Sequence, residues 1–139
     1  MNRSLAAAAA TLIGVPFRLH GRDPATGLDC VGLVAEAMRR TGSVPAVPAG
    51  YRLRAMTVHA MLPFAEANGF EPISLAELGP SDVILAMVNP VQPHLLVCTE
   101  GGFIHAHSGL GRVTFMPGGL PWAVAGAWRL STIMPSSGN

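Results

Sequence analysis

Two cysteines and five histidines are the side chains of this sequence best suited to nucleophilic and acid–base chemistry. Cys30 is the most informative, because it directly follows Asp29, a residue type typical of helix N-caps. At the first turn of a helix, free backbone N–H groups and the helix dipole favour the thiolate, which is the nucleophilic form. The negative charge of Asp29 acts weakly against it. The same N–H groups could hold an oxyanion during acyl transfer. The alternative for Cys30 is a small buried hydrophobe.

Cys98 has a different context, because it lies within the apolar run Leu95–Thr99. A buried structural thiol is the default reading of such a position. Two cysteines are too few for a disulfide scaffold, and a single bridge from Cys30 to Cys98 is disfavoured by their unlike surroundings.

Three histidines lie at positions where they could act with Cys30 in acid–base chemistry. His94 begins a predicted strand, whereas His105 and His107 lie two residues apart on the next strand and therefore point to one face. If these strands pair through the turn at 100–102, His105 lies near His94. A Cys–His pair with a third group that orients the imidazole is the general arrangement for thiol catalysis. Two alternatives are ordinary strand-edge residues and a zinc site, the latter disfavoured by the missing companion motifs.

The elements that must position these residues follow from the apolar periodicity. Helices are predicted over residues 2–13, 30–41 and 57–68, with one further turn at 75–78. We interpret the first as an opening helix of the domain rather than a secretory signal peptide, because its apolar run is mostly alanine and no clear cleavage site follows. Residues 18–28 are predicted to form a loop.

The second half of the chain has the pattern of short strands. They are predicted at residues 82–88, 94–99, 103–107, 112–115 and 125–130. Helices followed by strands indicate an α+β fold, with the N-terminal helices packed on one side of a C-terminal antiparallel sheet.

The composition is that of one globular domain spanning residues 1–139. Half of the residues are apolar and 12% are charged, the opposite of a disordered chain. The net charge of +1 gives no basis for an electrostatic attraction to nucleic acid or to a membrane surface. No apolar segment is long enough to span a bilayer.

Several segments, taken in order, resemble the NlpC-type peptidoglycan peptidases, the NlpC and p-sixty family. The matching blocks are Gly-Val-Pro-Phe at 14–17, Asp-Cys-Val-Gly-Leu-Val at 29–34, Pro-Ser-Asp-Val at 80–83, His-Leu-Leu-Val at 94–97 and Phe-Ile-His-Ala at 103–106. The resemblance implies a papain-like fold and a thiol peptidase that cuts the stem peptides of the bacterial cell wall without a metal or other cofactor.

The resemblance also implies roles for individual residues. It makes Cys30 the nucleophile, His94 the general base and then general acid, and His105 the orienting third member, with His107 as the alternative for that place. Phe17, Asp29 and His107 are expected to line the substrate cleft.

Residues 104–130 look most like the small versions of this family encoded with phage tails and gene-transfer particles. That resemblance implies an enzyme that opens the wall for tail passage, with tail or baseplate proteins as partners. It would be made in the cytoplasm without a signal peptide and act at the cell wall from the particle.

Three departures from the family pattern bear on activity. Phe17 replaces the usual Tyr, Val31 replaces the Ser after the nucleophile, and residues 18–22 lack an aromatic-Gly-Gly pattern. Phe17 supports the alternative of a weakly active or inactive structural component of a tail tip or baseplate, Val31 is the smaller departure, and the altered loop is expected to change the cleft wall near Cys30. An amidase or acyltransferase on a non-wall substrate and a zinc-binding module are further alternatives.

Overall fold

The computed structural model describes residues 4–46, 58–89 and 92–131. It contains three α-helices and one short 3₁₀-helix among these residues: α1 (Leu5–Ala10), α2 (Cys30–Arg40), α3 (Val58–Ala67) and η2 (Leu75–Glu77). Gly14, with a φ of 97°, lies in the turns that follow α1, and Pro63 lies inside α3. None of the helices among the described residues is long and apolar enough to cross a membrane.

The strands form two sheets. A small hairpin joins β1 (Arg22–Asp23) to β2 (Gly27–Leu28). The main sheet contains β3 (Phe70–Pro72), β4 (Val83–Asn89), β5 (Gln92–Thr99), β6 (Gly102–His107), β7 (Arg112–Pro117) and β8 (Ala123–Leu130). Its strand order is β3-β8-β4-β5-β6-β7, and every neighbouring pair is antiparallel.

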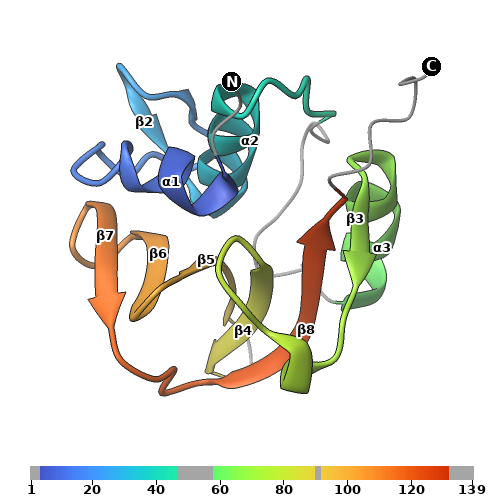
Figure 1. Cartoon of the computed structure of the whole chain (residues 1–139). Helices are drawn as coiled ribbons and strands as arrows, with labels where there is room; N and C mark the ends of the chain where they lie inside the picture. Colours follow the sequence, from blue (N-terminus) through green and yellow to red (C-terminus); the bar gives the residue numbers. More distant parts are fainter. Residues whose placement is uncertain (1–3, 47–57, 90–91, 132–139) are drawn as a thin grey trace.

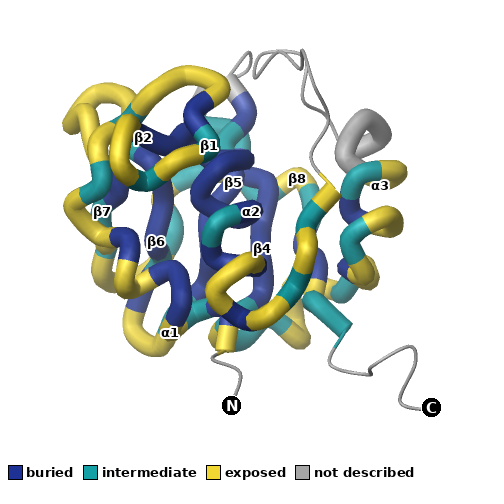
Figure 2. The backbone as a smooth tube through the Cα atoms, turned by 90° about the horizontal axis from the view of Figure 1, so that it is seen from above, coloured by how far each residue is buried: buried dark blue, intermediate teal, exposed yellow. Residues whose placement is uncertain are grey.

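The helices cover one face of the main sheet (Figure 1). The core on that face joins α1 and α2 to alternate residues of β4, β5 and β6. Leu33, Val34, Ala37 and Met38 form the inward side of α2, as their helical spacing predicts, and each is buried. Seen from above, α2 and the central strands form the buried middle of the molecule, whereas the loops around β1 and β2 are exposed (Figure 2).

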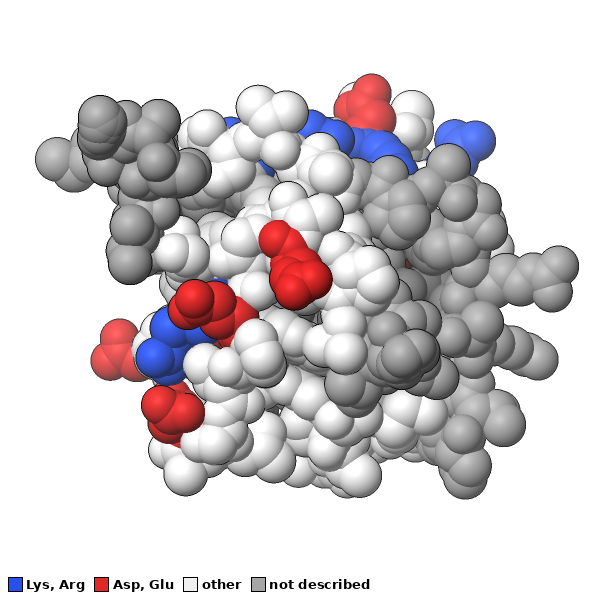
Figure 3. Space-filling model, turned by 90° about the vertical axis from the view of Figure 1, so that its right-hand side faces the viewer, with Lys and Arg blue, Asp and Glu red and all other residues white. Residues whose placement is uncertain are grey.

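The other face of the sheet carries a second, smaller apolar cluster. Its buried members are Ile84, Ala86, Leu96, Cys98 and Ala127. Partly buried apolar side chains pack against them from the residues that flank η2, from the segment before β8 and from β6, β7 and β8: Ile73, Leu78, Phe103, Met116, Leu120, Trp122 and Val124. Charged groups are sparse on the side of the molecule drawn in Figure 3: most stand in small groups near its left and upper margins, and one acidic group lies near the middle.

The predicted α+β architecture is confirmed, with differences in its shortest elements. The opening helix is shorter than the predicted 2–13 within the described residues, because the chain turns at 11–14. The predicted loop 18–28 contains the β1–β2 hairpin, and β3 was not predicted. All three missed strands have only two or three residues, too few to show a period-two pattern.

Ser81 is held in an unusual backbone conformation just before β4. Its φ is 75°, in the left-handed region that disfavours residues with a Cβ. Its side-chain oxygen accepts a hydrogen bond of 3.0 Å from the backbone N–H of Ala6, in the first turn of α1. Ser81 thereby ties α1 to the start of β4 and satisfies one of the free N–H groups of that helix.

Candidate active site

Asp29 fixes the start of the helix that carries Cys30. Its Oδ1 accepts the backbone N–H of Gly32 at 2.8 Å, which caps α2, and its Oδ2 accepts the N–H of His20 at 2.8 Å. Asp29 is fully buried. Its carboxylate therefore holds both the helix and the preceding loop in place, a structural task beside the expected place in the cleft.

Two glycines allow that loop to lie directly against the helix. A Cβ on Gly32 would stand 2.0 Å from the carbonyl oxygen of Gly21, and a Cβ on Gly21 would stand 2.2 Å from that of Gly27. No larger residue fits at either position without moving the backbone. The glycine two residues after Cys30 is thus required by close packing beside that cysteine.

The structure brings His94 and His105 into direct contact. Nε2 of His94 lies 2.8 Å from Nδ1 of His105, and their ring planes are nearly perpendicular. β5 and β6 pair as a hairpin around the turn at Glu100 and Gly101, as the Gly-Gly turn in the sequence predicts. This hydrogen bond leaves Nδ1 of His94 for another partner.

His107 takes part in a different contact. Its ring centroid lies 5.2 Å from that of His105, and its Nδ1 accepts the backbone N–H of Leu110 at 3.0 Å. Of the two histidines on this face of β6, His105 is the one bonded to His94. His105 is also the more deeply buried of the two.

Trp122 lies against both histidines of the pair. The sequence did not identify it as a site residue. Its ring stands edge-on to both imidazoles, with centroids 6.4 Å from His94 and 6.0 Å from His105. It precedes β8 in a Gly- and Pro-rich segment without periodicity. No signal in the sequence distinguishes it from a surface aromatic residue.

The thiol of Cys30 is fully buried beside β5. Burial raises its pKa to about 12, and the Asp29 carboxylate adds to the rise. The backbone N–H groups of Leu95, Val31 and Cys30 itself act in the opposite direction and lower the pKa. The contribution of Leu95 places the sulfur next to the residue that follows His94. The expectation that the helix terminus favours a thiolate is outweighed by burial in the resting protein.

Both imidazoles are held in the neutral form. Burial, with smaller contributions from the neighbouring His105 and His107, lowers the pKa of His94 to about 3. Burial, with a contribution from His107, lowers the pKa of His105 to about 4. At neutral pH the resting site therefore contains a thiol and two uncharged imidazoles.

Phe17 lies on the core side of the site. It packs against the main core, and its backbone N–H donates to the carbonyl oxygen of Gly111 at 2.8 Å. A bridge to Leu28 also ties it to the end of β2, one residue before Asp29. Phe17 thus lies near the start of α2, where the family's Tyr would bring a hydroxyl.

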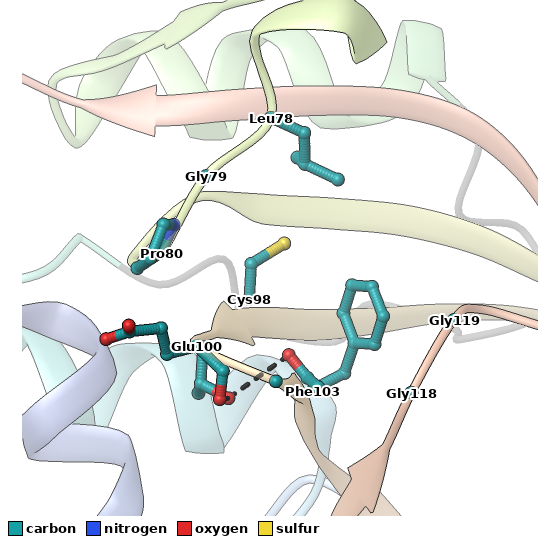
Figure 4. A pocket seen from close by; sticks show the side chains of 11 residues that line it. Leu78, Gly79, Pro80, Cys98, Glu100, Phe103, Gly118 and Gly119 are labelled. Carbon is teal, nitrogen blue, oxygen red and sulfur yellow. Dashed lines mark hydrogen bonds between the residues drawn. The ribbon is translucent and has the colours of Figure 1, made fainter.

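A separate hollow of about 440 Å³ lies at the C-terminal end of β5, away from His94 (Figure 4). It is lined by Leu78, Cys98, Phe103 and several glycine residues, and by none of Cys30, His94 and His105. Both cysteines are free thiols. Burial raises the pKa of Cys98 to about 12, and the Asp82 carboxylate adds to the rise. Cys98 thus has the raised pKa expected of a buried structural thiol, and it lies apart from the histidine pair.

The zinc alternative finds no support in the part of the chain that the structure describes. No group of three His, Cys, Asp or Glu side chains there is arranged to hold a metal ion. The nearest pair, His94 and His105, are hydrogen-bonded to each other.

Comparisons with known proteins give a consistent answer for the fold. The sequence matches no protein-family model and no curated protein. Among solved structures, it is similar to NlpC1 from Trichomonas vaginalis, with a TM-score of 0.65 and 21% identity over 91% of this chain. The match covers 42% of NlpC1, so this chain spans less than half of that protein.

Two peptidoglycan hydrolases are also similar in structure. The NlpC/p60 domain of SagA matches with a TM-score of 0.57 and 22% identity, over 82% of this chain and 86% of that domain. RipB from Mycobacterium tuberculosis matches with a TM-score of 0.60 and 21% identity, over 91% of this chain and 63% of RipB. The chain therefore has the fold of the NlpC/P60 domains.

Proposed function

We propose that this protein is a cell-wall cysteine peptidase that cleaves amide bonds in peptidoglycan stem peptides. The observation that carries the proposal is the hydrogen bond between His94 and His105. His94 lies on β5, and the next residue on that strand, Leu95, contacts the Cys30 thiol through its backbone N–H. A helix-borne thiol, a buried imidazole and a group that orients this imidazole are the parts needed for thiol acyl transfer. Similarity to domains of peptidoglycan hydrolases supports the choice of substrate.

The tautomers of the two imidazoles follow from the proposed mechanism. For Nδ1 of His94 to accept the thiol proton, its Nε2–H must donate to Nδ1 of His105. His105 then carries its own proton on Nε2 and stabilises the imidazolium that forms on His94. His105 acts in this way as the orienting third member.

The reaction begins from neutral groups, because burial raises the pKa of the thiol and lowers that of the imidazole. His94 removes the proton as sulfur attacks the amide carbonyl, and backbone N–H groups at the start of α2 hold the oxyanion. The imidazolium of His94 then protonates the leaving amine. Water hydrolyses the thioester with His94 as base, which restores the thiol.

The test is digestion of purified peptidoglycan by the wild type and by Cys30→Ala, with the released peptides identified by mass. We expect the wild type to release cut stem peptides and Cys30→Ala to lose at least a thousandfold in rate while keeping its melting temperature. Cys98→Ala is the matched control and should digest like the wild type. Near-normal release by Cys30→Ala would exclude the proposed nucleophile.

A second candidate is a weakly active or inactive structural component of a tail tip or baseplate. The observations that favour it are the raised pKa of the Cys30 thiol and the missing hydroxyl at Phe17. In that case neither the wild type nor Phe17→Tyr would digest peptidoglycan. Recovery of activity by Phe17→Tyr alone would instead identify a peptidase weakened by this one substitution.

Association with a phage-tail-like particle stays a prediction that rests on the resemblance of residues 104–130. Synthesis in the cytoplasm and delivery with the particle belong to the same prediction. Co-purification of the chain with assembled particles, and its absence from particle-free culture medium, would be the supporting result.

A further inference from the structure

A row of side chains extends from the histidine pair across the end of the sheet. In the β6–β7 pair, His107 stands directly opposite Arg112. Directly opposed residues of antiparallel strands point to the same face, and His105, two residues before His107, shares it. The row of imidazoles on β5 and β6 therefore continues into a guanidinium on β7, the last strand of the sheet (Figure 1).

The segment after α1 adds a second arginine to this row. Pro16 bridges Arg112 in the antiparallel sense, and the backbone N–H of Phe17 donates to the carbonyl oxygen of Gly111 at 2.8 Å. Arg18, two residues beyond Pro16, therefore falls on the same side as Arg112. Phe17 faces the other way, into the core.

Arg112 and Arg18 differ from the arginines of α2 and β8 in their electrostatic surroundings. Arg112 and Arg18 are exposed, and within the described part of the chain neither forms an ion pair with a carboxylate. By contrast, the described arginines of α2 and β8 each pair with a glutamate or an aspartate. Asp29 is the acidic residue next to the start of α2. Its side chain is buried and already accepts two backbone N–H groups.

We propose that Arg112 and Arg18 bind a carboxylate of the substrate peptide on the β7 side of the catalytic histidines. A guanidinium matches the planar geometry of a carboxylate and can donate two parallel hydrogen bonds to it. Because both side chains are exposed, they can meet a ligand without breaking an existing ion pair. This assignment rests on the proposed peptidase function and makes the two arginines specificity-determining residues.

The experiment compares two synthetic stem peptides that differ only in whether their side-chain and terminal carboxylates are free or amidated. Wild type, Arg112→Gln, Arg18→Gln and the double variant are assayed, with Arg39→Gln on α2 as the control. We expect the wild type to show a KM about three- to tenfold lower for the carboxylate peptide, as for one charge-assisted contact. Each of the two single Arg→Gln variants should raise that KM, leave kcat nearly constant and leave the amidated peptide nearly unaffected.

Two results would overturn the proposal: equal KM values of the wild type for both peptides, or equal effects of Arg112→Gln and Arg39→Gln. The preference should also shrink as NaCl rises, because exposed charges are screened. If the wild type cleaves neither peptide, the proposed function fails, and calorimetric binding of both peptides to Cys30→Ala still decides the role of the arginines. Selective binding of the carboxylate peptide that Arg112→Gln removes would sustain it, and unselective or absent binding would end it.

Discussion

Cys30 stands in an environment that acts on its acidity in two opposite directions. Backbone N–H groups at the start of α2 and at Leu95 favour the thiolate, whereas burial and the Asp29 carboxylate favour the thiol. Burial has the largest effect, since removing a thiolate from water costs more than a few N–H groups return. The resting side chain of Cys30 is therefore a thiol, and in the proposed mechanism its activation depends on His94.

Alkylation of Cys30 should reveal this directly. In a Cys98→Ala chain, modification by iodoacetamide should be slow at pH 7 and accelerate about tenfold per pH unit up to pH 9.5, because only the thiolate reacts. Mass spectrometry of timed samples gives the rate. A plateau below pH 8 would contradict a raised pKa and indicate a thiolate already present in the resting enzyme.

The sequence predicted where the candidate residues lie better than it predicted their protonation states. Alternation and a Gly-Gly turn, both of which are local, predicted that His94 lies near the face of β6 that carries His105 and His107. The choice between His105 and His107 needed the side-chain geometry, because both lie on one face of β6. The raised pKa of Cys30 depends on burial beneath strands more than fifty residues away, which a local pattern does not report.

At the scale of elements, the loop before α2 and the helix itself are joined by one buried carboxylate. Asp29 accepts N–H groups from Gly32 within the helix and from His20 in the loop. His20 has a φ of 61°, so the chain makes a left-handed turn there at a cost of about 1 kcal/mol. The bond to Asp29 helps to offset that cost.

Replacing Asp29 should therefore destabilise more than the loss of an ordinary helix cap. Asp29→Ala leaves two N–H groups without this acceptor, and we expect the free energy of unfolding to fall by about 2–3 kcal/mol in urea titrations. Asp29→Asn keeps one acceptor oxygen and should lose less. Asp23→Ala is the exposed control. It removes the acceptor of the Ala25 backbone N–H and should lower the free energy of unfolding by about 0.5 kcal/mol. Similar losses for Asp29→Ala and Asp23→Ala would argue against the linking role.

The long elements were predictable, whereas the shortest were not. α2 has a cap, an apolar side and a terminal Thr-Gly pair, and each signal acts within a few residues. β3 has three residues, and only its pairing with β8 makes it a strand. The hydrogen bond of Ser81 to Ala6 joins segments 75 residues apart, which no local pattern predicts.

For the whole molecule, the histidine pair links the candidate chemistry to the stability of the fold. The pKa values of His94 and His105 are about 3 and about 4 in the folded protein, against 6.5 for a free imidazole. Between these values the unfolded chain binds more protons than the folded one. The contribution to stability is therefore complete above pH 6.5 and is lost as the pH falls towards 3.

Acidification should accordingly lower the melting temperature before most carboxylates are protonated. By pH 5 the loss from His94 alone amounts to about 2 kcal/mol, since each pKa unit is worth about 1.4 kcal/mol. The measurement is the slope of the melting temperature between pH 7 and pH 5, compared with that of a His94→Gln, His105→Gln double variant. The double variant should show a flatter slope, whatever its stability at pH 7. An equal slope would mean that both imidazoles accept protons in the folded state. The neutral base on which the proposed mechanism depends would then be absent at mildly acidic pH, and activity would have to fall in the same pH range.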